Sequence, residues 1–283
     1  MSRVSVITIN RGRGAHLVRL LQGLARGQPP DECVVVTMGQ DDNGVPDPAV
    51  PIQQVALPGD GLPLAEARNR GREAATGEAL VFLDVDCIPS SSLVAGLQVA
   101  LAEHDGLVCC EIRYLPGGAV SDGWTESELS RLGHPHPART FPAVGIEPAE
   151  HPGLFWSLAF GIRASAFDRI GGFDPGFIGY GAEDTDFAYR AAAAGVPILF
   201  AGGMRAFHQR HTACDPPLQH FADIVRNARR FKARHGTWPM AGWLDAFAAR
   251  GLIAPEREQD LVILRSPTPE EITAAQLADD RPF

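Results

Sequence analysis

The chain has 283 residues, of which 45% are hydrophobic, and a net charge of −9 at pH 7. This length suits one large domain, or a domain with an appendage. The acidic balance argues against a nucleic-acid surface, which needs clustered Lys and Arg. The dense basic run at 229–232 is typical of a solvated helix face, with a membrane or phosphate contact as the alternative. No segment approaches the ~20 apolar residues that cross a bilayer. We therefore expect a soluble globular protein with no nucleic-acid partner and no integral membrane segment, and the oligomeric state is left open.

The five cysteines are odd in number and fit no zinc spacing. Most of them fall in or beside apolar, strand-like segments, where reduced Cys acts as a small hydrophobe. They are Cys33, Cys87, Cys109, Cys110 and Cys214. This pattern indicates a reducing compartment. Because the amino terminus reads directly as a strand, without a signal peptide, a cytoplasmic location is the simplest expectation.

Strand and helix signals alternate over residues 1–112, which predicts a largely parallel sheet with helices packed against it. Unbroken apolar runs indicate inner strands, and leucines at i, i+3, i+4 and i+7 indicate a helix with one buried face. The expected strands cover residues 4–9, 33–37, 52–56, 79–83 and 107–112. The expected helices cover residues 17–24, 64–75 and 91–102, the last with a Ser N-cap. A loop is expected at Asp41-Asp42-Asn43-Gly44.

Residues 113–155 are rich in Pro, Gly and His and lose periodicity, so we expect loops over a substrate site. The His-Pro pairs in this segment are typical of turns. Beyond it, strands are expected at 157–162 and 198–200, and helices at 185–194, at 221–231 and from the capping box at 268–271. The predicted organisation is a main domain over 1–211, divided into 1–112 and 113–211, and a helical C-terminal extension over 212–283.

Two carboxylates, Asp84 and Asp86, follow the inner strand at 79–83. The carboxyl ends of parallel strands open into the crevice where open α/β sheets bind ligands. Side chains two positions apart on extended backbone point the same way, and paired negative charges need a cation or hydrogen bonds beside them. A divalent metal that also holds a diphosphate is one interpretation. A solvated turn at the strand end is the other.

A second acidic pair, Glu183 and Asp184, follows the glycine-rich segment Gly179-Tyr180-Gly181-Ala182. The pair falls in the first turn of the helix expected next, where the helix dipole favours ionised carboxylates. It can simply cap that helix, or one carboxylate can point into the crevice as a general base.

Two histidines, His208 and His211, follow the last expected strand of the main domain. At i and i+3 they can share one face of a helical turn or flank a loop. A single His is more often structural. A pair in a chain that already offers Asp86 suits a mixed oxygen and nitrogen site for Mn²⁺ or a similar ion.

Three motif groups occur in order along the chain. The first is the strand and loop at 4–11. The second runs from Ala67-Arg68-Asn69-Arg70-Gly71 to Leu83-Asp84-Val85-Asp86, and the third from Phe160-Gly161-Ile162-Arg163 to Glu183-Asp184-Thr185-Asp186. Together they resemble family 2 glycosyltransferases over about residues 3–211. The later motifs, with His208-x-x-His211, look most like the galactosyltransferase-type branch.

The resemblance implies a GT-A fold, a nucleotide-sugar donor and inversion at the anomeric carbon. It implies Asp184 as general base, with Glu183 and Tyr180 contacting the acceptor. It implies a divalent metal, Mn²⁺ with Mg²⁺ as the alternative, held by Asp86, His208 and His211. The implied donor contacts are Thr8, Asn10, Arg11, Arg68, Asp84, Val85 and Asp86. In these terms, 1–112 is the nucleotide-binding half and 113–211 the acceptor and metal half.

The chain departs from the family at two places. His208 stands where animal galactosyltransferases carry Met, and a second imidazole favours borderline ions. Thr37-Met38-Gly39-Gln40 replaces the Asp run that usually reads the base, so UDP is favoured without being fixed. The donor sugar stays open, as does the acceptor, which can be a glycan, a lipid-linked sugar, a peptide or a metabolite.

Two other functions fit parts of the sequence. A nucleotidyltransferase uses a similar sheet and metal, and Arg11-Gly12-Arg13-Gly14 weakly resembles its phosphate loop. That reaction has no use for Glu183-Asp184 or for the His pair. A catalytically silent glycan-binding or scaffold subunit would keep the fold, but the intact acidic and His motifs argue against it. The sequence therefore favours a metal-dependent glycosyltransferase.

Overall fold

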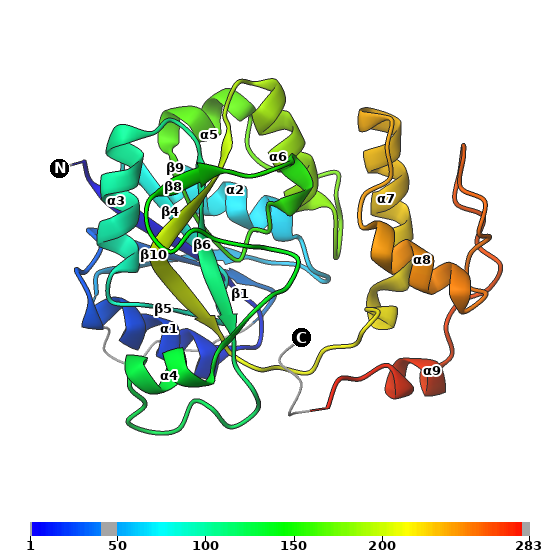
Figure 1. Cartoon of the computed structure of the whole chain (residues 1–283), viewed down its shortest axis with the longest axis horizontal. Coiled ribbons are helices and arrows are strands. Elements are labelled where there is room, and N and C mark those ends of the chain that lie inside the picture. The colour runs from blue at the N-terminus through cyan, green and yellow to red at the C-terminus, as the bar shows by residue number, and fades with distance from the viewer. Residues whose placement is uncertain (1, 41–49, 279–283) are drawn as a thin grey trace.

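The protein is described by a computed structural model over residues 2–40 and 50–278. Within these residues, ten strands form one sheet whose main path is β3-β2-β1-β4-β9-β6-β10-β5 (Figure 1). The strands are β1 (Val4–Asn10), β2 (Glu32–Met38), β3 (Ile52–Leu57), β4 (Ala79–Leu83), β5 (Cys87–Pro89), β6 (Leu107–Tyr114), β7 (His134–Pro135), β8 (Ile146–Pro148), β9 (Ala159–Arg163) and β10 (Ile198–His208). The expected inner strands are confirmed. The loop expected at 41–44 lies outside the described residues.

The helices cover both faces of this sheet and continue beyond it. They are α1 (Gly14–Arg26), α2 (Leu64–Ala74), α3 (Leu93–Glu103), α4 (Glu126–Leu132), α5 (Ala164–Ile170), α6 (Glu183–Ala193), α7 (Phe221–His235), α8 (Ala241–Ala249) and α9 (Pro269–Ala274), with 3₁₀ turns at Pro152–Leu154 and Leu218–His220. None of the helices in the described ranges is long and apolar enough to cross a bilayer.

The sheet has a parallel half and a mixed half. Strands β3, β2, β1 and β4 are parallel, as expected. Strand β9 then runs antiparallel between β4 and β6, and β6 pairs in parallel with β10. The antiparallel insertion of β9 was not foreseen. The strand expected at 198–200 also continues to His208, past an irregularity between Ala201 and Arg205.

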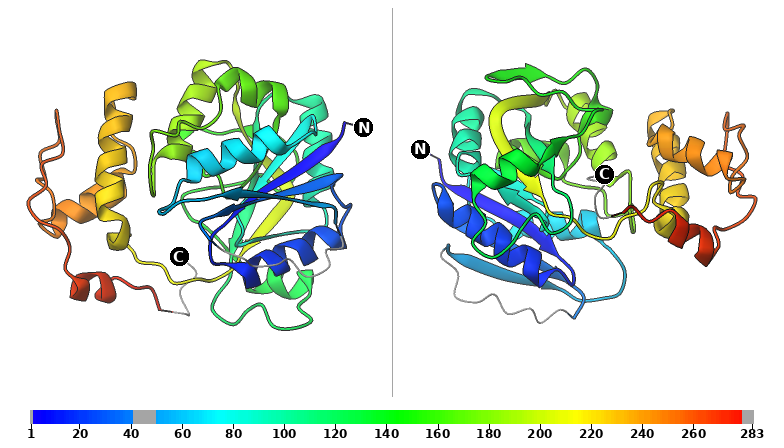
Figure 2. Two further views of the ribbon diagram at one scale, coloured as in Figure 1. Left: turned by 180° about the vertical axis from the view of Figure 1, so that it is seen from behind. Right: turned by 60° about the horizontal axis from the view of Figure 1, so that its bottom comes forward.

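Alternating side chains of the strands feed two separate cores. In β1, Val4 and Val6 pack with α1 and α3, whereas Ile7 and Ile9 pack with α2, α5 and α6. Figure 2 shows α2 (cyan) and α1 (blue) on opposite sides of the sheet. This double cover explains why the inner strands are apolar at nearly every position.

A stack of phenylalanines fixes α6 against the sheet. Phe173 and Phe187 stack with ring centroids 4.2 Å apart, and Phe82 of β4 stacks on Phe160 of β9 at 4.8 Å. Phe187 is fully buried one turn after Asp184. The first turn of α6 is therefore held in a defined position relative to the end of β4.

The expectation of loops throughout 113–155 is wrong in part: α4 forms over 126–132, and β7, β8 and a 3₁₀ turn also lie in this segment. The helix starts at a capping box in which Thr125 Oγ1 accepts from the Glu128 N–H at 3.3 Å. Trp124 and Leu129 are buried against Phe207, which gives the helix its own small core. The Thr-x-x-Glu pattern was readable in the sequence, but the helix is too short to show periodicity.

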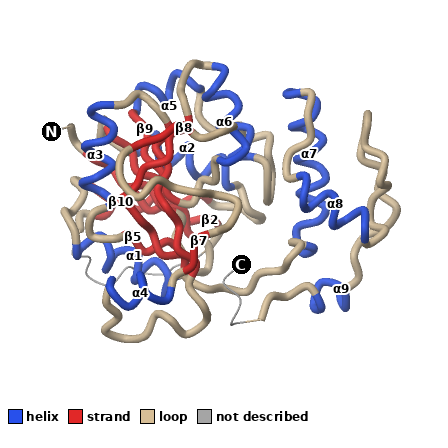
Figure 3. Tube along the Cα trace, in the orientation of Figure 1, coloured by secondary structure: helices blue, strands red, loops and turns tan. Residues whose placement is uncertain are grey.

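The C-terminal segment, residues 212–278, contributes α7, α8 and α9. Figure 3 shows the strands gathered in one body, with these helices beside it. The long helix expected at 221–231 is confirmed, as is the capping box of Thr268 and Glu271. Asn227 of α7, fully buried, donates to the carbonyls of Ile178 and Gly181 at 3.1 and 2.9 Å. The segment thus holds the loop that leads into α6.

An ion-pair cluster joins α6 to α7. Asp186 is fully buried and accepts hydrogen bonds from Arg190, Arg234 and His235 at 2.8, 2.7 and 2.9 Å. A buried carboxylate needs such partners, because an uncompensated charge in the interior is costly.

Asp186→Asn keeps the shape of the side chain and removes its charge. We expect the free energy of unfolding to fall by about 3 kcal/mol, because the ion pairs that this fully buried carboxylate makes with Arg190 and Arg234 are lost. Urea denaturation measures this change. The control Asp260→Asn breaks an ion pair with Arg229 in which the carboxylate is 64% exposed. It should cost less than about 1 kcal/mol. Equally small losses in both variants would contradict the docking of α7 on α6.

Candidate active site at the ends of strands β4 and β10

Asp84 and Asp86 lie at the carboxyl end of β4, where the sequence placed them. The chain turns after Leu83, and the Cys87 N–H donates to the Asp84 carbonyl at 2.8 Å. The Gln209 N–H donates to the Asp86 carbonyl at 2.7 Å, which ties this turn to the end of β10. The 4% exposed Asp86 is therefore held on both sides by backbone hydrogen bonds.

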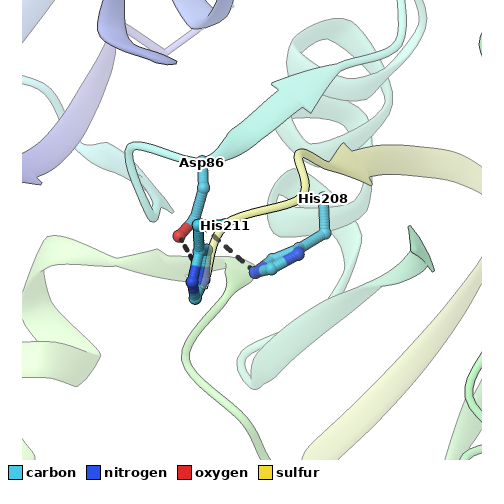
Figure 4. Close-up of side chains that lie close together, drawn as sticks. All are labelled: Asp86, His208 and His211. Atoms are coloured by element: carbon cyan, nitrogen blue, oxygen red, sulfur yellow. Dashed lines mark ion pairs between the residues drawn. The ribbon is translucent and has the colours of Figure 1, made fainter. Parts of the chain in front are cut away.

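His208 and His211 converge on the Asp86 carboxylate (Figure 4). His208 is the last residue of β10, in register with Cys87 of β5 and Tyr114 of β6. Its Nε2 lies 3.6 Å from Asp86 Oδ1, and His211 Nε2 lies 3.4 Å from Asp86 Oδ2. Of the two placements considered for the pair, the strand end and following loop are correct, and the helical turn is wrong.

The three side chains fit a divalent cation. Their ligand atoms, one carboxylate oxygen and two imidazole nitrogens, lie within 4.8 Å of one another. Neighbouring ligands bonded at about 2.1 Å to one ion lie about 3.0–3.4 Å apart at octahedral or tetrahedral angles. The 3.4 and 3.6 Å separations from Asp86 are close to this range, so small side-chain movements would bring the ligand atoms around an ion. His211 Nδ1 lies 3.0 Å from the Thr212 carbonyl, which can only accept, so the Nε2 lone pair is available to a metal. Burial lowers the pKa of His208 to about 4, although Asp86 opposes the shift, so this imidazole is neutral at pH 7.

Arg13 is a further member of the site that the sequence did not single out. Its guanidinium contacts the Asp86 carboxylate, and its backbone N–H donates to Asn10 Oδ1 at 3.2 Å. Burial alone would raise the pKa of Asp86, yet three groups hold it well below its usual range: His208, which is protonated at the low pH where this carboxyl titrates, the hydrogen bond with His211, and the Arg13 guanidinium. The available signal was the Arg11-Gly12-Arg13-Gly14 run, in which Arg11 had been chosen from the resemblance.

Arg68 joins the two acidic motifs. Its guanidinium, nearly fully buried, donates to Asp84 Oδ1 and to Glu183 Oε1, both at 3.1 Å. Two segments about a hundred residues apart in sequence thus meet at one side chain. Arg68 was expected beside the donor, and this position lies between the donor and acceptor motifs.

Glu183 and Asp184 occupy the first turn of α6, as expected. Asp184 Oδ1 accepts from the Thr185 N–H at 2.6 Å, whereas the N-cap residue, Ala182, makes no side-chain capping hydrogen bond. Burial raises the pKa of Asp184, and Arg68 opposes the shift. Burial and the neighbouring Asp184 charge raise the pKa of Glu183 to about 7, again against Arg68. Glu183 Oε2 is buried without a hydrogen-bond partner among residues 2–40 and 50–278.

The other predicted residues surround this centre. Thr8 and Asn10 are buried in β1, and Thr8 Oγ1 has no hydrogen-bond partner in the described ranges. The side chain of Val85 packs into the core shared with α1 and α3. Tyr180 stacks on His220 at 4.4 Å and on Trp243 at 6.0 Å, so the C-terminal segment sets the orientation of its ring.

Family comparisons agree with this architecture. Residues 4–170 match glycosyl transferase family 2, and residues 149–212 match the N-terminal domain of galactosyltransferase. Since the first match spans more than half of the chain, the protein belongs to glycosyltransferase family 2. Membership of this family supports a glycosyltransferase and disfavours the nucleotidyltransferase alternative.

The chain is similar in sequence to individual proteins named as glycosyltransferases. The chain is 30% identical over 270 residues to validoxylamine A glucosyltransferase of Streptomyces hygroscopicus subsp. limoneus, covering 82% of this chain and 56% of the relative. It is 25% identical over 186 residues to putative polypeptide N-acetylgalactosaminyltransferase 9 of Drosophila melanogaster, covering 61% of this chain and 26% of the relative. The chain spans about half the length of the glucosyltransferases it matches.

Solved structures show the same fold. Residues 1–349 of S. aureus TarS align with a TM-score of 0.55 at 15% identity, covering 87% of this chain and 69% of that one. A complex of GalNAc-T7 with UDP, GalNAc and Mn²⁺ aligns with a TM-score of 0.54 at 18% identity, covering 88% and 55%. At these identities the likeness establishes the GT-A fold alone.

Stability between about pH 5 and pH 7 should report on Glu183. Its pKa in the folded protein, about 7, exceeds the ordinary 4.5. Its contribution is therefore fully present below pH 4.5 and is lost as the pH rises through about 7. The groups that face it are Arg68, Asp184 and Tyr180. Because Asp84 and Asp184 also have raised pKa values, the comparison between chains is what isolates Glu183: we expect the loss on this rise, measured by urea denaturation, to be about 2 kcal/mol smaller in Glu183→Gln than in the wild-type chain.

The control for this measurement is Glu73→Gln, since the Glu73 side chain is 61% exposed on α2. It should leave the pH profile unchanged. An unchanged profile in Glu183→Gln would show that this carboxyl does not titrate in the stated window.

Proposed function

We propose that the protein is an inverting, metal-dependent glycosyltransferase that uses a UDP-sugar, with Asp184 as the general base toward an acceptor hydroxyl. The observation that carries this proposal is the convergence of Asp86, His208 and His211 at the end of β4. Arg68 connects this set to the acidic pair, since it donates to Asp84, two residues before Asp86, and to Glu183, next to Asp184.

The donor side has the ligands that a diphosphate-binding metal needs. One carboxylate and two imidazoles suit Mn²⁺ better than Mg²⁺, which prefers oxygen ligands. When bound there, the ion would supply positive charge toward the departing diphosphate. The GalNAc-T7 structure is a complex with UDP and Mn²⁺, and a TarS structure is a complex with UDP. Both support uracil as the base of the donor.

Residues of the loop after β1 would complete the donor site. Arg13 contacts the Asp86 carboxylate and would offset negative charge on the leaving group. Thr8, Asn10 and Arg11 lie on the same strand and loop and would contact the nucleotide. Asp84 would face the ribose or the sugar, while Val85, whose side chain is in the core, would contribute backbone only.

On the acceptor side, Asp184 would take the proton of a hydroxyl as that oxygen attacks the anomeric carbon. Attack from the face opposite the diphosphate inverts the configuration. A burial-raised pKa favours proton uptake by the carboxylate. The free Oε2 of Glu183 would accept a hydrogen bond from the acceptor, and Tyr180 would supply a flat surface beside it.

The proposed organisation follows these roles. Residues 1–112 form the nucleotide-binding half, and 113–211 the acceptor and metal half. Residues 212–283 would be a C-terminal extension, and its described part, 212–278, orients Tyr180 through His220 and Trp243. The acceptor would be a glycan, a lipid-linked sugar, a peptide or a metabolite.

Calorimetry with UDP, GDP and TDP, with and without Mn²⁺, tests the donor site. We expect UDP to bind most tightly and its affinity to fall at least about tenfold without the metal. Asp86→Ala and His208→Ala should produce a similar loss in the presence of Mn²⁺. The control His104→Ala removes an imidazole at the end of α3 and should change nothing. UDP binding that ignores both the metal and Asp86→Ala would sink the metal assignment.

Asp184→Asn tests the base. We expect release of UDP from UDP-glucose to slow by about 10²–10⁴, because a positioned base is lost. Mn²⁺-dependent UDP affinity should stay unchanged. The matched control Asp168→Asn alters a carboxylate that is 56% exposed and paired with Arg72, and should keep full turnover. Full turnover by Asp184→Asn would rule out this residue as base.

A further inference from the structure

A buried arginine with unmet hydrogen-bonding capacity lies beside the proposed active site. Arg139 is 5% exposed, and its Nε and Nη2 have no hydrogen-bond partner among the described residues. These two nitrogens form one edge of the guanidinium, and their N–H groups point the same way. That edge is the one that binds a carboxylate or phosphate through two parallel hydrogen bonds.

Aromatic rings surround this guanidinium. Its central carbon lies 4.9 Å from the Trp156 ring centroid, 5.0 Å from that of Phe141 and 5.2 Å from that of Phe200. A turn also fixes the residue, since its backbone N–H donates to the His136 carbonyl at 3.1 Å. Ring contacts stabilise a guanidinium less than a paired oxyanion does, and they leave its N–H edge unsatisfied.

The cavity at Arg139 carries an uncompensated positive charge. Glu111 also lines it, but Arg113 and Arg205 pair with that carboxylate at 2.9 and 2.8 Å. Arg139 also reaches the Cys109 thiol, whose pKa burial raises to about 11 although Arg139 opposes the shift. The thiol is therefore neutral at pH 7 and provides no counter-charge.

A short series of contacts connects the cavity to the proposed active site. Tyr114, in its wall, packs on His208 with ring centroids 5.1 Å apart. Trp156, in another wall, meets His136 edge-on at 4.7 Å. The next residue, Ser157, makes a backbone hydrogen bond to Asp184. The cavity thus lies next to both the metal ligands and the proposed base.

The cavity is small, with about 10 Å³ of space for a water-sized group. We propose that it is the inner end of an acceptor subsite, in which the Nε–Nη2 edge of Arg139 binds the oxygens of a carboxylate or a phosphate monoester whose carbon skeleton lies outside the cavity. The half-buried Trp156 would pack against the carbon skeleton that carries this group. The acceptor would therefore be an acidic molecule. This subsite rests on the proposed function in that the bound molecule is taken to be the acceptor.

Calorimetry with matched probes, in the absence of donor and metal, tests the subsite. The first pair is methyl glucuronide against methyl glucoside, and the second is glycerol 3-phosphate against glycerol. We expect the acidic member of at least one pair to bind at least about tenfold more tightly, because charged bidentate hydrogen bonds are strong. The pair that shows the preference identifies a carboxylate or a phosphate as the recognised group.

Arg139→Gln should abolish this preference. Arg139→Lys keeps the charge but loses the fork, so it should retain part of the preference and provides a second variant if the first is unstable. The control Arg169→Gln removes an equal charge from the 43% exposed pair with Asp105, and should keep the full preference. A wild-type chain that binds neither acid better than its neutral partner, or an undiminished preference in Arg139→Gln, would overturn the subsite.

Mn²⁺-dependent UDP binding by each Arg139 variant reports separately on the donor site. Retained UDP binding with lost acid preference supports the subsite in a folded protein. If the wild-type chain shows the acid preference but no metal-dependent UDP binding, the donor assignment fails while the anion site stands.

Discussion

The Arg68 guanidinium, buried between Asp84 and Glu183, is the interaction on which the rest of the site depends. It is one positive charge facing three carboxylates, since Asp184 also acts on it. One guanidinium cannot offset three carboxylates, so burial and repulsion between the carboxylates raise their pKa values. The pKa of Asp84 rises to about 6 and that of Glu183 to about 7. The carboxylates around Arg68 thus outnumber its positive charge, which favours proton uptake by Glu183 and Asp184.

The fold supplies the rigidity that such a charge arrangement needs. Asp86 is fixed by the turn after β4 and by the backbone bond from Gln209, so its carboxylate faces the end of β10. The stacking of Phe187 on Phe173 fixes the helix turn that carries Asp184. The ion pairs of Asp186 hold α6 against α7. The positions of Asp86 and Asp184 thus depend on the local turn, on core packing and on the C-terminal segment.

Much of this was predictable, for identifiable reasons. Apolar runs define the inner strands, and a carboxylate that follows such a run must lie at the strand end, so Asp84 and Asp86 were placed correctly. The antiparallel position of β9 between β4 and β6 could not be predicted, because strand order depends on pairing between segments that are distant in sequence. Arg13 and Arg139 were missed since their roles come from contacts with distant segments. The loops expected over α4 were wrong because a two-turn helix has too few residues for a hydrophobic period.

The hydrogen bonds from Asn227 to the loop before α6 have a consequence for local unfolding. Since one amide on α7 holds the carbonyls of Ile178 and Gly181, opening of that helix releases the loop at the same time. We therefore expect the backbone amides of the loop and of α7 to exchange hydrogen as one cooperative unit, distinct from the strands of the sheet. Opening of that unit would also remove the ring contacts of Tyr180 with His220 and Trp243.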